Sequence, residues 1–120
     1  MSKTNEFETD WAEYIFQNTD LTGIGDAGGL KGDAVAGNLY AALYTTTPTD
    51  STSGTECTYG SYTRVALARS GAGWTVAGNN TSNTAQILFP QCSSGNNTAV
   101  GVGVLASSGS GGTTLMYFGT

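Results

Sequence analysis

The side chains best able to do chemistry in this sequence are carboxylates, because the chain contains no histidine. Without histidine, most general-base arrangements, catalytic triads and zinc sites are excluded. The carboxylates Glu6, Asp10 and Glu13 fall on one flank of an expected helix. We interpret this flank as a solvated or interfacial face and not as a catalytic pair. We therefore expect a protein that is not an enzyme, with no catalytic residue, no cofactor and no metal site.

The glycine-rich segment at residues 23–28 matches the dinucleotide-binding pattern GxGxxG. That motif requires a strand before it and a helix after it, whereas here it follows an expected helix. Asp26 would also place a negative charge where a phosphate should lie. The neighbouring acids Asp20 and Asp33 are spaced too far from it for a compact calcium loop. We interpret the segment as a loop with solvated acids.

The charge is divided unevenly along the chain. Nine acidic residues and two lysines lie at or before Glu56, which gives −7, and Arg64 and Arg69 give +2 to the remainder. A net charge of −5 argues against nucleic-acid binding, which depends on Lys and Arg. No run reaches the ~20 apolar residues of a membrane span, and the N-terminus lacks the apolar core of a signal peptide. We expect no membrane partner, and synthesis and assembly in the cytoplasm. Cys57 and Cys92 could form a pair, but in a reducing compartment two free thiols are expected.

An amphipathic helix is expected at residues 5–17. Asn5 and Glu8 are spaced as a capping box. One helical stripe follows it, made of Phe7, Trp11, Tyr14 and Ile15. A helix of this length is marginal in isolation, so the stripe should dock on the rest of the chain. Phe16 falls on the opposite face, where it would either contact a neighbouring subunit or be buried under the following loop.

A β-rich body is expected at residues 38–120, after a glycine-rich loop at 20–37. The first strand, Asn38–Thr45, is apolar on both faces, so its second face should meet the helix, a second sheet or another subunit. Further strands are expected at Tyr59–Ala68, Gly73–Ala77, Thr84–Phe89, Ala99–Ala106 and Thr113–Phe118. The spacing predicts a single domain over residues 1–120, an antiparallel β-sandwich or open barrel with one N-terminal amphipathic helix.

The scarcity of charge, together with many Gly, Ser, Thr and Asn residues, suits surfaces that approach other proteins closely. The candidate interface residues are aromatic or cationic: Phe16, Tyr40, Tyr44, Arg64, Arg69, Tyr117 and Phe118. Arg64 could pair with Glu56 across a turn or with acids of a neighbouring subunit, and the default is a surface pair worth about 0–1 kcal/mol. A weaker alternative is a carbohydrate-binding platform of Trp74, Tyr59 and Tyr62, although aromatic residues in strands are more often core.

Three stretches together resemble a group of small tailed-phage proteins often labelled phage tail fibre proteins. They are Gly37–Pro48, Gly60–Leu67, and Gly73–Val76 with Asn83–Pro90. The resemblance implies a virion component and carries no catalytic residue. Members of that group often continue past the equivalent of Tyr117 with further strands, which raises the expectation that a neighbour adds a strand here.

These observations lead to a non-enzymatic virion structural protein. The favoured role is a capsid decoration, or cement, protein on the particle exterior, because a low-charge strand half suits packing and the acidic half can meet a complementary patch. The alternative is a tail-fibre or head-fibre component with an adhesion role. The expected partners are copies of the same chain, with a trimer plausible, and the major capsid protein or tail proteins.

Overall fold

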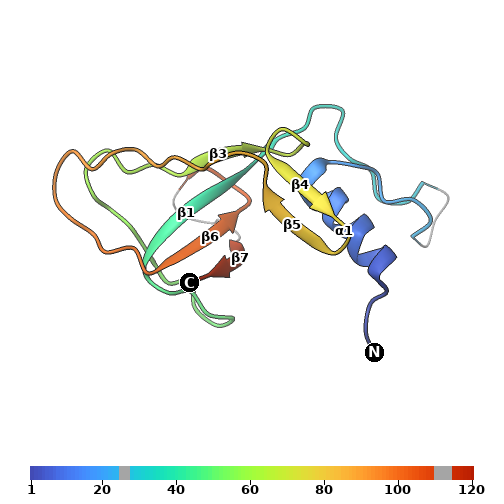
Figure 1. Cartoon of the computed structure of the whole chain (residues 1–120), viewed down its shortest axis with the longest axis horizontal. Coiled ribbons are helices and arrows are strands. Elements are labelled where there is room, and N and C mark those ends of the chain that lie inside the picture. The colour runs from blue at the N-terminus through green and yellow to red at the C-terminus, as the bar shows by residue number, and fades with distance from the viewer. Residues whose placement is uncertain (25–27, 110–114) are drawn as a thin grey trace. The chain divides into compact units, whose positions relative to one another are not determined.

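The computed structural model describes residues 1–24, 28–109 and 115–120 (Figure 1). The described residues form one helix and seven strands: α1 (Asn5–Gln17), β1 (Asn38–Thr46), β2 (Thr55–Glu56), β3 (Val65–Ala68), β4 (Trp74–Ala77), β5 (Asn80–Asn83), β6 (Gly101–Leu105) and β7 (Leu115–Gly119). The expected fold class is confirmed, since the chain is mainly β, with antiparallel sheets and one N-terminal helix.

The chain divides into two compact units. The helical unit comprises residues 1–38 and 67–86, and the sheet unit comprises residues 39–66 and 87–120. The boundary falls inside β3, after residue 66. The expected single domain over residues 1–120 stays a prediction, and each unit is described by itself.

The helix of the helical unit begins one residue earlier than the capping box implied. Thr4 is the N-cap, and its hydroxyl accepts a hydrogen bond from the Phe7 backbone N–H at 3.3 Å. Asn5 therefore lies inside the helix and does not cap it, because the Glu8 N–H that it was expected to bind donates to the Thr4 carbonyl at 3.0 Å. The helix ends at Asn18, which adopts the left-handed conformation with φ 60°. Asparagine tolerates this conformation better than most residues.

The docking face of α1 differs from the expected one. Phe16 is the buried residue of the helix, and its ring lies 4.7 Å from that of Trp74, centroid to centroid. Trp11, from the expected stripe, is 37% exposed. Of the two alternatives for Phe16, burial is the one observed, although the residue that covers it is Trp74 on β4. A single large ring can fill one pocket more completely than a row of side chains can cover a flat surface.

The second sheet is a two-stranded hairpin in the helical unit. Its register pairs Trp74 with Asn83 and Ala77 with Asn80, across a turn in which Gly78 has φ 62°. Glycine at the first turn position is typical of tight hairpins. The expected strand Thr84–Phe89 is wrong, and the polar strand β5 replaces it. Periodicity could not indicate β5, because its sequence, Asn-Thr-Ser-Asn, has no apolar alternation.

The sheet unit is built on β1, the long strand with two apolar faces. The strand order is β2-β1-β6-β7, and β3 also pairs with β1. The core contains Ala42, Tyr44 and Leu105, with Leu115 packed against them. Gly103 makes this packing possible, because a Cβ there would lie 2.7 Å from Leu115 Cδ1 and 2.9 Å from Tyr44 Cε2. Tyr44, an expected interface residue, is therefore part of the chain's own core.

Two long segments of the sheet unit are irregular where strands were expected. The expected strand Tyr59–Ala68 is regular only from Val65, and Ala99–Ala106 shortens to Gly101–Leu105. The last expected strand becomes Leu115–Gly119, and its positions 113 and 114 lie outside the described residues. The backbone of Gly60 bonds to Ser94 and Ser93 instead of a continuing ladder. Those local bonds divert residues 59–64 from the sheet.

Candidate functional site

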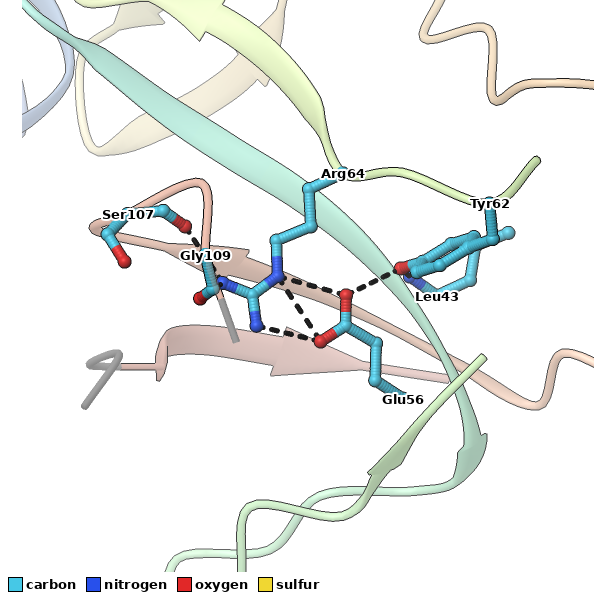
Figure 2. Close-up of polar contacts among 6 residues, drawn as sticks. All are labelled: Leu43, Glu56, Tyr62, Arg64, Ser107 and Gly109. Atoms are coloured by element: carbon cyan, nitrogen blue, oxygen red, sulfur yellow. Dashed lines mark hydrogen bonds and ion pairs between the residues drawn. The ribbon is translucent and has the colours of Figure 1, made fainter. Parts of the chain in front are cut away.

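The most extensive polar network in the sheet unit centres on Arg64 (Figure 2). Its Nη2 lies 2.7 Å from Glu56 Oε2, and its Nε donates to Glu56 Oε1 at 2.9 Å. The side chains of Arg64 and Glu56 are 8% and 22% exposed. The expected pairing of Arg64 with Glu56 within the chain is thus the one observed. The expected surface position is wrong, because the guanidinium is nearly buried.

The same network ties together segments that are distant in sequence. Arg64 Nη1 donates to the carbonyl oxygens of Ser107 at 2.9 Å and Gly109 at 2.6 Å, directly after β6. The Tyr62 hydroxyl donates to Glu56 Oε1 at 2.8 Å and accepts from the Leu43 N–H at 3.0 Å. All of these acceptors belong to the chain itself. The network therefore holds the turn after β6, which leads toward β7.

The pKa shifts of the network favour the charged pair. Burial raises the pKa of the Glu56 carboxyl, but the hydrogen bonds from Arg64 and Tyr62 outweigh it and leave the pKa below its usual value. The hydrogen bond to Glu56 raises the pKa of Arg64. Burial raises the pKa of Tyr62, so its phenol stays protonated and can donate. The pair is therefore ionised at neutral pH.

A hollow of about 320 Å³ borders this network, and Cys57 and Ser108 contribute to its lining. Burial raises the pKa of the Cys57 thiol. A protonated thiol is a poor nucleophile. Cys57 and Cys92 are both free, the first buried and the second exposed. The hollow thus combines a neutralised ion pair with an inactive thiol, which does not make a reaction centre.

Arg69 has a structural position in the helical unit. Its Nε donates to the Ile15 carbonyl at 2.8 Å, and its Nη2 donates to the Tyr14 carbonyl at 2.7 Å. Carbonyls at a helix C-terminus lack partners within the helix, and a cation there also complements the helix dipole. Arg69, predicted as an interface residue, therefore caps α1 from outside the helix.

The three aromatic residues of the carbohydrate alternative do not form a platform. Trp74 is buried beneath Phe16 in the helical unit. Tyr59 and Tyr62 belong to the sheet unit, where Tyr62 stacks on Phe89 with ring centroids 6.3 Å apart. The Tyr59 hydroxyl donates to the Pro90 carbonyl at 2.8 Å. These rings pack inside their own units, so the predicted carbohydrate-binding platform of Trp74, Tyr59 and Tyr62 is wrong.

Strand β7 lies at one edge of the larger sheet, next to β6 (Figure 1). Tyr117 and Phe118 on this strand are 44% and 43% exposed, and Val102 on β6 is 52% exposed. The register places Tyr117 opposite Val104 and Phe118 opposite Gly103, so the two aromatic side chains point to opposite faces. Tyr40, on β1, is half-buried. The structure thus brings the predicted residues Tyr117 and Phe118 together on one uncharged edge.

The acids of the glycine-rich stretch have local partners. Asp20 Oδ2 pairs with Lys31 Nζ at 3.0 Å, and its Oδ1 accepts from the Gly32 N–H. Those hydrogen bonds lower the pKa of Asp20. The Asp33 carboxylate accepts from the Val35 N–H at 3.2 Å, and the Asp33 backbone bonds to the Asn18 side chain. Asp26 lies outside the described residues. Across residues 1–24, 28–109 and 115–120, no cluster of His, Cys, Asp or Glu is arranged to hold a metal ion.

Sequence reasoning assigned Phe7 and Trp11 to the docking stripe of the helix, whereas in the structure Trp11 is exposed and Phe7 is half-buried. Phe7 and Trp11 stack on the N-terminal half of α1, with ring centroids 6.3 Å apart, and border a hollow of about 290 Å³ together with Lys3. The signal that could have indicated their exposure is the flank of acids beside them.

In the part of the chain described here, no helix is long and apolar enough to span a membrane.

Comparison with known proteins gives one family. The model of the family described as podophage GP4 fiber I protein gp80 matches residues 30–119. No curated protein and no solved structure matches the chain. The matched range includes all seven strands and excludes α1.

Proposed function

The chain belongs to the family of podophage GP4 fiber I protein gp80, and we propose that it is a non-enzymatic structural subunit of a phage virion. The geometry of the Arg64 network supports this proposal, because its donors are used on Glu56 and on backbone carbonyls of the same chain. A catalytic group would have to face a substrate. Here the polar network around Arg64 instead holds the turn after β6 in place.

The observation that carries the proposal is the uncharged edge strand β7. Natural edge strands are usually protected by charges, prolines or bulges that prevent pairing with other chains. β7 has the sequence Leu-Met-Tyr-Phe-Gly, with no charge and no proline, and a register irregularity lies near its start. Its aromatic side chains are exposed on both faces. Such an edge supports pairing with a copy of the same chain by β-strand addition.

For its place on the particle, we propose the capsid exterior, as a decoration protein that packs in clustered copies. The uneven charge supports this role, because the half up to Glu56 carries −7 and can meet a basic patch on the shell. The second candidate is a fibre component. The matched family is described as a fiber protein, which agrees with that role as it does with a virion structural protein in general. Both roles require repeated contacts between subunits.

The experiment that separates the two places is the copy number in purified virions, measured by quantitative mass spectrometry against the major capsid protein. Decoration predicts one copy per capsid subunit, or one per few. A fibre predicts copies in the range of a tail component. Absence of the chain from purified virions would refute the proposed function in both forms.

A further inference from the structure

Helix α1 is held to its unit by its C-terminal end. The Tyr14 and Ile15 carbonyls accept from Arg69, the Phe16 ring packs on Trp74, and Gln17 Nε2 donates to the Trp74 carbonyl at 2.9 Å. These contacts come from the last four residues of a thirteen-residue helix. These anchoring contacts are therefore concentrated at the C-terminal end of the helix.

The helix also carries an aromatic row of Phe7, Trp11 and Tyr14, in which Trp11 is exposed and the other two side chains are half-buried. Phe7 stacks on Trp11 with an interplanar angle of 25°, and Trp11 lies 6.0 Å from Tyr14, centroid to centroid. In helical projection the residues of this row lie about 140–180° from Phe16, at ~100° per residue. The apolar stripe that gives the helix its amphipathic pattern is thus a different face from the one that packs. A partly exposed tryptophan beside a shallow hollow is typical of a binding surface.

Acids flank the aromatic row. Glu6, Asp10 and Glu13 lie along one side of it, and Glu8 lies on the other side, within 4.0 Å of Lys3 Nζ. The segment thus has four carboxylates against one lysine. A second copy of this face would bring like charges together, which disfavours helix-to-helix self-association. The charge instead complements a partner that is basic.

We propose that the acidic aromatic face of α1, made of Phe7, Trp11 and Tyr14 with the flank Glu6, Asp10 and Glu13, docks into an apolar groove rimmed by Lys and Arg on another virion protein. This mode, a helix laid into a groove, uses anchors spaced by three and four residues, as these aromatic residues are. Residues 1–29 lie outside the family match, so the residues of this surface are not among those that the family model covers. The inference rests on the proposed function, since it assigns the partner to the virion.

The test uses phage particles assembled without this chain and the full-length purified protein. Binding of the wild-type chain to the particles is measured by co-sedimentation over a range of protein and salt concentrations. Trp11→Ala is expected to weaken binding at least about tenfold, since exposed aromatic anchors dominate interfaces of this kind. The variant E6Q/D10N/E13Q is expected to bind more weakly at low salt and to lose most of the salt dependence. Val35→Ala, at an exposed apolar residue of the same unit, is the matched control and should bind as the wild type does.

The outcomes separate this inference from the function on which it rests. If the wild-type chain binds and both variants bind equally well with unchanged salt dependence, the inference is overturned and the proposed function stands. If the wild-type chain does not bind the particles, both fail. Thermal unfolding of each variant checks the fold, and the charge variant carries the test if Trp11→Ala does not fold. A changed sedimentation coefficient of free Trp11→Ala, with particle binding unchanged, would assign the face to self-association and overturn the inference.

Discussion

At the residue scale, the buried pair between Arg64 and Glu56 is the contact most sensitive to substitution. Arg64→Met preserves the length of the side chain but leaves the Glu56 carboxylate partly buried without its cation. Removing one partner of such a pair costs about 2–4 kcal/mol, most of it the penalty on the remaining charge. Urea unfolding of Arg64→Met should show this loss of stability. Lys31→Met breaks the exposed pair with Asp20 and should cause a much smaller loss, because solvent screens an exposed pair. Equal losses in the two variants would contradict the buried role of Arg64.

The carboxyl of Glu56 also predicts how stability depends on pH. Its pKa is lower in the folded chain than the ordinary value of about 4.3, so ionised Glu56 stabilises the fold above that value. This contribution is lost as the pH falls through the folded-state pKa. Glu56→Gln should therefore lower stability at pH 7 and reduce the further loss between about pH 5 and pH 2. Unfolding curves at each pH test this, with Glu6→Gln on the exposed helix face as the control. Parallel pH profiles for wild type and Glu56→Gln would refute it.

Sequence reasoning gave Glu56 as one of two possible partners of Arg64, but it did not predict that the Arg64 side chain is nearly buried. Glu56 and Arg64 lie eight residues apart, a separation that a turn can close. The carbonyls that cover the guanidinium come from Ser107 and Gly109, more than forty residues further along the chain. Nothing local to Arg64 specifies that contact. Burial depends on the strand order, which no single-residue pattern encodes.

At the element scale, the docking of α1 depends on one ring. Phe16→Ala removes the contact with Trp74 from a site that is 7% exposed, and it should cost about 3 kcal/mol. Phe7→Ala, on the aromatic row, should cost about 1 kcal/mol, because that side chain is only partly covered. Denaturant unfolding followed by tryptophan fluorescence compares the two variants. A larger loss of unfolding free energy for Phe7→Ala than for Phe16→Ala would contradict docking through Phe16 and support the docking face that the sequence predicted.

The helix and some of the strands could be predicted from sequence patterns, and other strands could not. Helical periodicity and polar capping located the helix within a residue, but they could not select the docking face, since aromatic residues occupy two faces. The apolar strands β1, β6 and β7 were found from their composition. β5 was missed because four polar residues pair through their backbone alone. The run ending at Phe89 read as a strand, yet Tyr62 and Phe89 pack as stacked rings in an irregular segment.

At the scale of the whole molecule, we propose that copies of the chain associate through the edge strand β7 of the larger sheet. β7 is the last strand in the order β2-β1-β6-β7 among the described residues. Pairing of β7 with the same strand of a second copy would be isologous and give a dimer. Pairing of β7 with a different segment of the next copy would be heterologous and can close a ring, such as the expected trimer. The oligomer's size therefore reports which surface accepts β7.

Phe118→Lys tests this edge directly. A lysine on an edge strand disfavours pairing with another chain, because its charge must be desolvated or brought near a second copy of itself. The variant should stay folded, since Phe118 is 43% exposed, and should shift the chain toward monomer in sedimentation velocity at micromolar concentration. Leu88→Lys, at a 70% exposed position in the irregular segment, is the matched control and should associate as the wild type does. If Phe118→Lys associates as the wild type does, β7 is excluded as the pairing edge. If both variants lose association, the cause is general charge repulsion and not the loss of strand addition.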